Sequence, residues 1–205
     1  MKRTEFFNLW SRLHGNAKIS GIVKGWLTIS FLLAKPLAKL RVTPNILTLL
    51  GLFFGVLLYL NSLSIWAILL LTLSLICDGV DGSLAIVTGK SSKWGAVLDS
   101  AVDRITEFFW ALTFISLGAN QNIVIAALLI ASIQEYLRAR AGGLGLRDVG
   151  VVTIAERPVR AAILFIAIIA YQIDVDIFNL LASIWLIMQS LSLLNVTKFT
   201  FKKLT

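Results

Sequence analysis

Long apolar stretches separated by short polar connectors dominate this sequence of 205 residues. Six stretches approach the ~20 residues that a helix needs to cross the hydrocarbon core of a membrane. They are residues 44–61, 64–88, 94–117, 122–141, 158–173 and 177–197. Pro44 and Pro158 stand near the starts of two of them, where the first turn of a helix accepts proline. The pattern predicts an all-α integral membrane protein with six transmembrane helices.

Residues 1–41 follow a different pattern, because they mix large apolar side chains with eight Lys or Arg residues. Such a mixture is typical of an amphipathic helix that lies in the headgroup layer of a membrane. We therefore expect two parts, an interfacial N-terminal segment at 1–41 and a six-span domain at 42–205.

Composition and charge agree with a membrane location. Hydrophobic residues make up 58% of the chain and charged residues only 15%, which excludes an ordinary soluble globule. The net charge of +8 could suit nucleic acid, but the basic residues border apolar stretches, which fits an anionic membrane surface better. If both termini are cytoplasmic, all 19 Lys and Arg fall on that side. We expect a multi-pass protein of the cytoplasmic membrane that binds membrane lipid and no nucleic acid.

Four aspartates interrupt the second and third apolar stretches: Asp78, Asp81, Asp99 and Asp103. An ionised side chain within a membrane is costly and usually functional. Because the first two are three residues apart and the last two are four apart, each pair projects from one face of a helix. Their oxygens are hard ligands of the kind that Mg²⁺ or Mn²⁺ prefers. The aspartates open toward the cytoplasm if the termini are cytoplasmic.

The acidic segment resembles the signature of the CDP-alcohol phosphatidyltransferase family, D-x₂-D-G-x₂-A-R-x₈-G-x₃-D-x₃-D. Every fixed position but one matches, with every spacing intact. The matching residues are Asp78, Asp81, Gly82, Ala85, Gly95, Asp99 and Asp103. Ile86 occupies the arginine position, so the chain would have to rely on Lys90, Lys93 or Arg104 for that charge. The interfacial segment, the six spans and Thr43-Pro44-Asn45 at the first span are further features of the family.

The resemblance implies an enzyme of phospholipid biosynthesis. It would transfer a phosphatidyl group from CDP-diacylglycerol, or an ether analogue, to a polar alcohol, and release CMP. Mg²⁺ or Mn²⁺ would be held by Asp78, Asp81 and Asp99, while Asp103 would act as the general base and could also bind a second metal ion. The resemblance places the CDP-lipid against Asn45, Asp78, Asp81, Gly82, Ala85 and Gly95. It also implies a homodimer.

Arginines gather where the fourth stretch ends and the fifth begins: Arg138, Arg140, Arg157 and Arg160. Guanidinium groups suit phosphate, so we expect a phosphorylated acceptor. These segments are similar to the branch of the family that makes phosphatidylinositol phosphate, or its archaeal ether-lipid counterpart, from an inositol phosphate. An arginine expected after Gln189 is absent, since Ser190 follows. Glycerol 3-phosphate, which gives phosphatidylglycerol phosphate, is therefore the rival acceptor.

The sequence leaves two functions of other classes open. A cation transporter would also carry acids within its spans, but it predicts interrupted helices and two similar halves, and the sequence has neither pattern. A non-catalytic scaffold is the third possibility.

Glu107 lies one more helical turn beyond Asp103. It could tune the proposed base by like-charge proximity or form an ion pair with an arginine, and the ion pair is the favoured interpretation.

Overall fold

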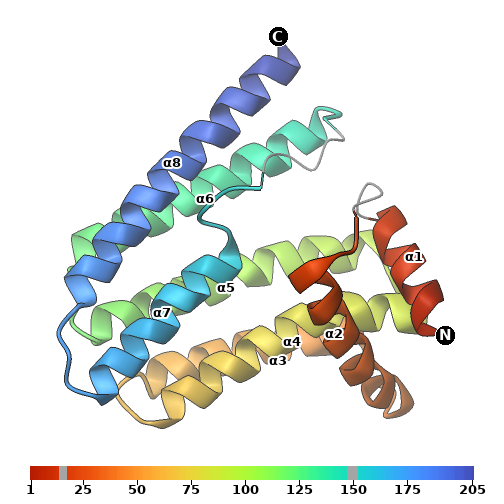
Figure 1. Cartoon of the computed structure of the whole chain (residues 1–205), viewed down its shortest axis with the longest axis horizontal. Helices are drawn as coiled ribbons and strands as arrows, with labels where there is room; N and C mark the ends of the chain where they lie inside the picture. The colour runs from red at the N-terminus through yellow and green to blue at the C-terminus, as the bar shows by residue number, and fades with distance from the viewer. Residues whose placement is uncertain (14–17, 147–151) are drawn as a thin grey trace. The chain divides into compact units, whose positions relative to one another are not determined.

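The structure, a computed structural model, describes residues 1–13, 18–146 and 152–205. These residues form eight α-helices (Figure 1). They are α1 (Arg3–Leu13), α2 (Gly21–Lys39), α3 (Pro44–Leu60), α4 (Trp66–Thr88), α5 (Lys93–Ser116), α6 (Gln121–Gly143), α7 (Arg157–Gln172) and α8 (Phe178–Leu204). The prediction of an all-α protein is confirmed.

Local sequence signals explain several helix ends. Helix α3 begins at Pro44, as predicted, and Pro158 lies in the first turn of α7. The side chain of Asn120 caps α6 by accepting hydrogen bonds from the backbone N–H groups of the second and third helical residues. Gly89 follows α4 with a φ of +66°, a conformation that glycine adopts without steric cost.

Three helices in the described ranges are long and apolar enough to cross a membrane: α4, α6 and α8. A fourth span arises only if Val23–Lys39 and Pro44–Leu60 are counted as one, and these two segments meet at a bend of 112°. Helices α3 and α7 have only 17 and 16 residues, and α5 carries several charges. Helices α3 to α8 coincide with the six predicted stretches, but the number of spans stays a prediction.

The described chain divides into two compact units, and the boundary falls within α3, α4 and α5. The first unit comprises residues 1–55 and 72–106. In its core, α4 packs against α2 and α3 through a cluster of five buried side chains: Ala34, Leu47, Cys77, Val80 and Leu84. Helix α3 approaches α4 closely at Gly51, where an added Cβ would lie 3.4 Å from the carbonyl oxygen of Ser74. The acidic segment thus lies on a tightly packed helix.

The second unit comprises residues 56–71 and 107–205. Helices α6 and α8 lie side by side in it (Figure 1). The amide of Gln189 on α8 donates a 2.9 Å hydrogen bond to Gln134 on α6, and both side chains are fully buried. Phe114 of α5 stacks on Trp185 of α8, with ring centroids 6.3 Å apart. Paired polar groups as well as apolar contacts therefore connect these helices.

Candidate active site

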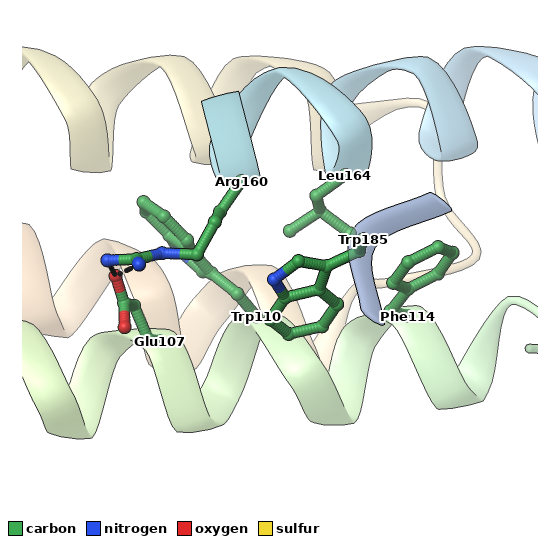
Figure 2. Close-up of a pocket in the computed structure, with 6 residues that line it drawn as sticks. All are labelled: Glu107, Trp110, Phe114, Arg160, Leu164 and Trp185. Carbon is green, nitrogen blue, oxygen red and sulfur yellow. Dashed lines mark hydrogen bonds and ion pairs between the residues drawn. The ribbon is translucent and has the colours of Figure 1, made fainter. Parts of the chain in front are cut away.

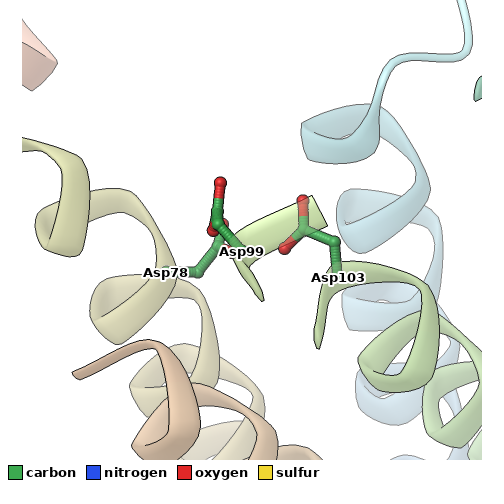
Figure 3. A group of neighbouring side chains, drawn as sticks. All are labelled: Asp78, Asp99 and Asp103. Carbon is green, nitrogen blue, oxygen red and sulfur yellow. The ribbon is translucent and has the colours of Figure 1, made fainter. Parts of the chain in front are cut away.

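Three of the four predicted aspartates converge in the first unit. Asp78 projects from α4, and Asp99 and Asp103 project from α5 (Figure 3). One carboxylate oxygen from each lies within 4.8 Å of the others. The three oxygens are close enough together for the group to hold one metal ion, and carboxylate oxygens are the hard ligands that divalent cations such as Mg²⁺ take. Two helices therefore bring distant residues into one candidate metal centre.

Asp81, the fourth aspartate, lies outside this group of three. Its side chain is buried, with 6% of its surface exposed. The hydroxyl of Thr48 on α3 donates a 2.5 Å hydrogen bond to Asp81 Oδ2, and the N–H of Gly82 donates one of 2.5 Å to Oδ1. Both oxygens of Asp81 are thus engaged within the protein, and its predicted role as a metal ligand stays a prediction.

The residues predicted to contact a CDP-lipid lie on the same helices. A Cβ added to Gly95, in the first turn of α5, would lie 3.4 Å from the side-chain oxygen of Asn45 on α3. These two positions are therefore neighbours. Gly82 is exposed, and among the described residues no atom lies within 4 Å of the place a Cβ would take. Close packing against another helix therefore does not explain why position 82 is a glycine. At Gly95, by contrast, an added side chain would meet close neighbours. Ala85, one turn further along α4, is partly buried.

Ile86, which replaces the arginine of the signature, is 4% exposed and packs in an apolar cluster. Among the three cations considered for the missing charge, Arg104 makes an ion contact with an acid: its Nη2 lies 4.0 Å from Asp103 Oδ2. Lys90 and Lys93 are exposed.

In the second unit, Glu107 forms the ion pair that we favoured. Arg160 donates to Glu107 Oε1 from Nη2 at 2.7 Å and from Nε at 3.1 Å, and both side chains are buried (Figure 2). Arg157 also approaches Glu107 Oε1, at 3.7 Å, and its guanidinium lies 5.1 Å from the centroid of the Trp110 ring. Glu107 thus ties α5 to the start of α7 through two of the four predicted arginines.

Arg138 is held by a different acid, Glu156, which precedes α7. Its Nη2 lies 2.6 Å from Glu156 Oε1 and its Nη1 lies 3.0 Å from Oε2. Thr153 donates to Oε1 as well, from its N–H and its hydroxyl. Burial alone would raise the pKa of Glu156, but the hydrogen bonds from Arg138 and Thr153 outweigh it and lower the pKa from 4.5 to about 2. Arg140 is exposed near the end of α6.

A buried chain of polar side chains continues from Arg160. Its Nη1 lies 3.4 Å from the side-chain oxygen of Gln189, which in turn donates to Gln134. This network was not predicted from the sequence. Its only sequence signal is the presence of two glutamines within apolar stretches, where an unpaired amide would be costly.

A small cavity lies beside these residues, lined by Glu107, Trp110, Phe114, Arg160, Leu164 and Trp185 (Figure 2). Its volume is about 20 Å³, which is room for about one water molecule. The cavity is therefore too small to hold a phosphorylated alcohol or a lipid chain.

Comparison with known proteins identifies relatives over most of the chain. The family model for CDP-alcohol phosphatidyltransferase matches residues 41–196. The phosphatidylinositol phosphate synthase of Corynebacterium glutamicum is 37% identical over 199 residues, covering 87% of this chain and 86% of the relative. The archaetidylinositol phosphate synthase of Pyrococcus horikoshii is 33% identical over 162 residues, covering 75% and 84%.

Two solved structures share the fold. The phosphatidylinositol phosphate synthase of Mycobacterium tuberculosis in complex with manganese and citrate superposes with a TM-score of 0.68 at 21% identity, over 84% of this chain and 88% of that one. The same enzyme with CDP-DAG bound gives a TM-score of 0.65 at 21% identity, over 85% and 94%. The matched range 41–196 contains all four aspartates. The chain is thus an enzyme that belongs to the CDP-alcohol phosphatidyltransferase family.

Proposed function

We propose that the protein transfers a phosphatidyl group from CDP-diacylglycerol, or its ether analogue, to a phosphorylated alcohol, and releases CMP. The observation that carries this proposal is the convergence of Asp78, Asp99 and Asp103 within the family signature. Relatives named for making phosphatidylinositol phosphate and archaetidylinositol phosphate favour an inositol phosphate as the acceptor. Glycerol 3-phosphate is the second candidate.

Asp78, Asp99 and Asp103 would hold Mg²⁺ or Mn²⁺, with Asp81 as a further ligand at the side of α3. The spacing of the three carboxylates and their hard oxygens fit such an ion. When bound, the ion supplies positive charge that neutralises the pyrophosphate of the donor and the departing CMP. Asn45, Gly82, Ala85 and Gly95 would contact the CDP-lipid, and the open space beside Gly82 leaves room for it.

Asp103 would act as the general base. Its carboxylate accepts the proton of the acceptor hydroxyl as that oxygen attacks the phosphorus of the phosphatidyl group. A new phosphorus–oxygen bond forms, the bond to CMP breaks, and CMP leaves with the electron pair. Arg104 lies 4.0 Å from this carboxylate and would add positive charge beside the reacting groups.

The acceptor phosphate would be bound by arginines at the ends of α6 and α7. We assign direct contact to Arg140, which is exposed, and to Arg157, whose 3.7 Å contact with Glu107 is looser than the 2.7 Å contact of Arg160. Arg160 is buried against Glu107, and Arg138 is held by Glu156. These two would act by keeping the neighbouring arginines in place.

We also propose the finer organisation predicted from the sequence. Helices α3 to α8 would make six spans in a domain at 42–205, and α1 and α2 would form an interfacial segment at 1–41. Both termini and the aspartates would face the cytoplasm, since the Lys and Arg sort to one side. The protein would work as a homodimer in contact with membrane lipid.

The reaction can be tested with purified protein, CDP-diacylglycerol, Mn²⁺ and a panel of inositol phosphate, glycerol 3-phosphate, free inositol and serine. Mass spectrometry would identify the lipid product. We expect a lipid product in which the phosphatidyl group is joined to inositol phosphate or to glycerol 3-phosphate. If free inositol gave the best yield, the proposed phosphate-binding role of the arginines would fail. If no acceptor in the panel led to the release of CMP, the proposed reaction would be wrong.

A further inference from the structure

Ile86 lies in a cluster that joins α4 to the two N-terminal helices. It packs with Phe6 of α1 and with Leu27 and Phe31 of α2. All four side chains are at most 4% exposed, and the rings of Phe6 and Phe31 lie 5.1 Å apart. The position at which the family signature has a charged side chain is thus an apolar contact between three helices.

Helix α2 covers the same face of α4 for two further turns toward the metal centre. Gly79, Ser83 and Ile86 are four and three residues apart, so they share one helix face. The hydroxyl of Ser83 donates a 2.9 Å hydrogen bond to Ser30 of α2. A Cβ on Gly79 would collide with the ring of Trp26, also on α2. Helix α2 therefore packs directly on the turn that carries Asp78.

An arginine could not occupy position 86 in this arrangement without disturbing it. Its guanidinium would be buried among Phe6, Leu27 and Phe31, and burial of an unpaired charge is far more costly than burial of isoleucine. The fit between Ile86 and its neighbours explains the departure from the signature. It also gives the N-terminal helices a specific contact with the metal-bearing helix.

We propose that Ile86 is a positioning residue, which docks α1 and α2 onto α4 and so holds Asp78 in the place where it binds the divalent cation. The inference rests on the proposed function, because it takes Asp78 as a metal ligand. Ile86 itself contacts neither the cation nor the substrate. The effect of Ile86 on Asp78 is transmitted by Trp26 and Ser30 of α2, which pack against α4.

Mn²⁺ binding, measured by electron paramagnetic resonance on the purified full chain in detergent, tests the inference without turnover. Ile86→Ala should weaken Mn²⁺ binding by about tenfold, the lower end of the range for residues that orient metal ligands. Phe6→Ala should act in the same direction from α1. Ile86→Leu should bind Mn²⁺ like the wild type, because it keeps the apolar volume.

Leu58→Ala is the matched control, since Leu58 is fully buried in the second unit. It should lower the unfolding temperature and leave Mn²⁺ affinity unchanged. The inference is overturned if Ile86→Ala binds Mn²⁺ as tightly as Leu58→Ala does. It is also overturned if Ile86→Arg binds Mn²⁺ or the CDP-lipid more tightly than the wild type, as a restored signature would.

The same measurement separates this inference from the proposed function. A wild-type protein that binds Mn²⁺ and releases no CMP would refute the proposed transferase reaction, while the comparison of Ile86 variants would still decide the docking role. A wild-type protein that binds no Mn²⁺ would refute the metal centre and this inference together.

Discussion

The hydroxyl of Thr48 donates a hydrogen bond to the carboxylate of Asp81 across 33 positions of sequence. Thr48 lies one turn into α3, and its hydroxyl also reaches the carbonyl oxygen of Pro44 at 3.1 Å. Both partners are buried. This contact orients the one aspartate of the signature that stands apart from the group of three, and it links the opening of α3 to the acidic segment of α4.

Removal of the Thr48 hydroxyl should weaken metal binding. We expect Thr48→Val, which keeps the shape of the side chain, to raise the Mn²⁺ concentration needed for half-maximal CMP release by about tenfold, as loss of a group that orients a metal ligand typically does. Thr48→Ser keeps the hydroxyl and should resemble the wild type. An unchanged Mn²⁺ requirement in Thr48→Val would contradict the proposal that Thr48 orients Asp81 as a metal ligand.

Arg160 and Arg157 should respond differently to substitution. Arg160→Ala removes the guanidinium that pairs with the buried carboxylate of Glu107, and breaking a buried ion pair costs about 3–5 kcal/mol of stability. We therefore expect a lower unfolding temperature.

Arg157→Ala should instead raise the KM for the phosphorylated acceptor about tenfold or more, since a hydrogen bond to a charged group contributes about 1.5–3 kcal/mol. It should change the KM for the CDP-lipid much less.

A double variant provides the control for Arg160. Replacing both partners, as in Glu107→Leu with Arg160→Met, should recover much of the stability that Arg160→Ala loses, because no buried charge remains. If Arg160→Ala unfolded like the wild type and raised the acceptor KM, Arg160 would be a substrate ligand and our assignment would be reversed.

The ion pair between Glu156 and Arg138 should persist at moderately acidic pH. The pKa of Glu156 is lowered to about 2 in the folded protein, from 4.5, so its contribution to stability is fully present above pH 4.5 and is lost as the pH falls toward 2. The difference in unfolding temperature between the wild type and Glu156→Gln should thus stay constant from neutral pH to about 4.5 and shrink below it. A difference that vanished near neutral pH would contradict this.

Topology can be tested by cysteine labelling in a Cys77→Ala background. Gln121, at the start of α6, and Asp176, before α8, are exposed. Cysteines placed at these two positions should react with a membrane-impermeant reagent from outside intact cells. Ser91, in the connector between α4 and α5, should not react until the membrane is opened. Labelling of all three from one side would rule out the six-span arrangement.

Much of the fold could be predicted from the sequence, because apolar stretches of helical length are a local signal. Helices α3 to α8 coincide with the predicted stretches for this reason. The convergence of Asp78 with Asp99 and Asp103 followed from the intact spacing of the signature. Such spacing records which residues act together even when the contact between helices is unknown.

The partners of individual polar groups could not be predicted. Glu107 was expected to meet an arginine, but Arg160 lies 53 positions away and only the packing of α5 and α7 selects it. Thr48 gives no sequence signal at all, since a threonine in an apolar helix commonly bonds to its own backbone. The sequence shows that Ile86 departs from the family signature. It does not show which residues of α1 and α2 contact Ile86, because these contacts depend on tertiary packing.

The most direct test of the proposed transferase reaction is CMP release from CDP-diacylglycerol in the presence of Mn²⁺ and a phosphorylated acceptor. We expect release by the wild type and by the control Asp176→Asn, whose side chain is exposed before α8. Asp103→Asn keeps the shape of the base but cannot take the proton, so its turnover at saturating Mn²⁺ should fall at least ~10²-fold. Near-normal turnover in Asp103→Asn would contradict the role of Asp103 as the base, and release that persists when a chelator removes the metal would contradict the metal-dependent reaction.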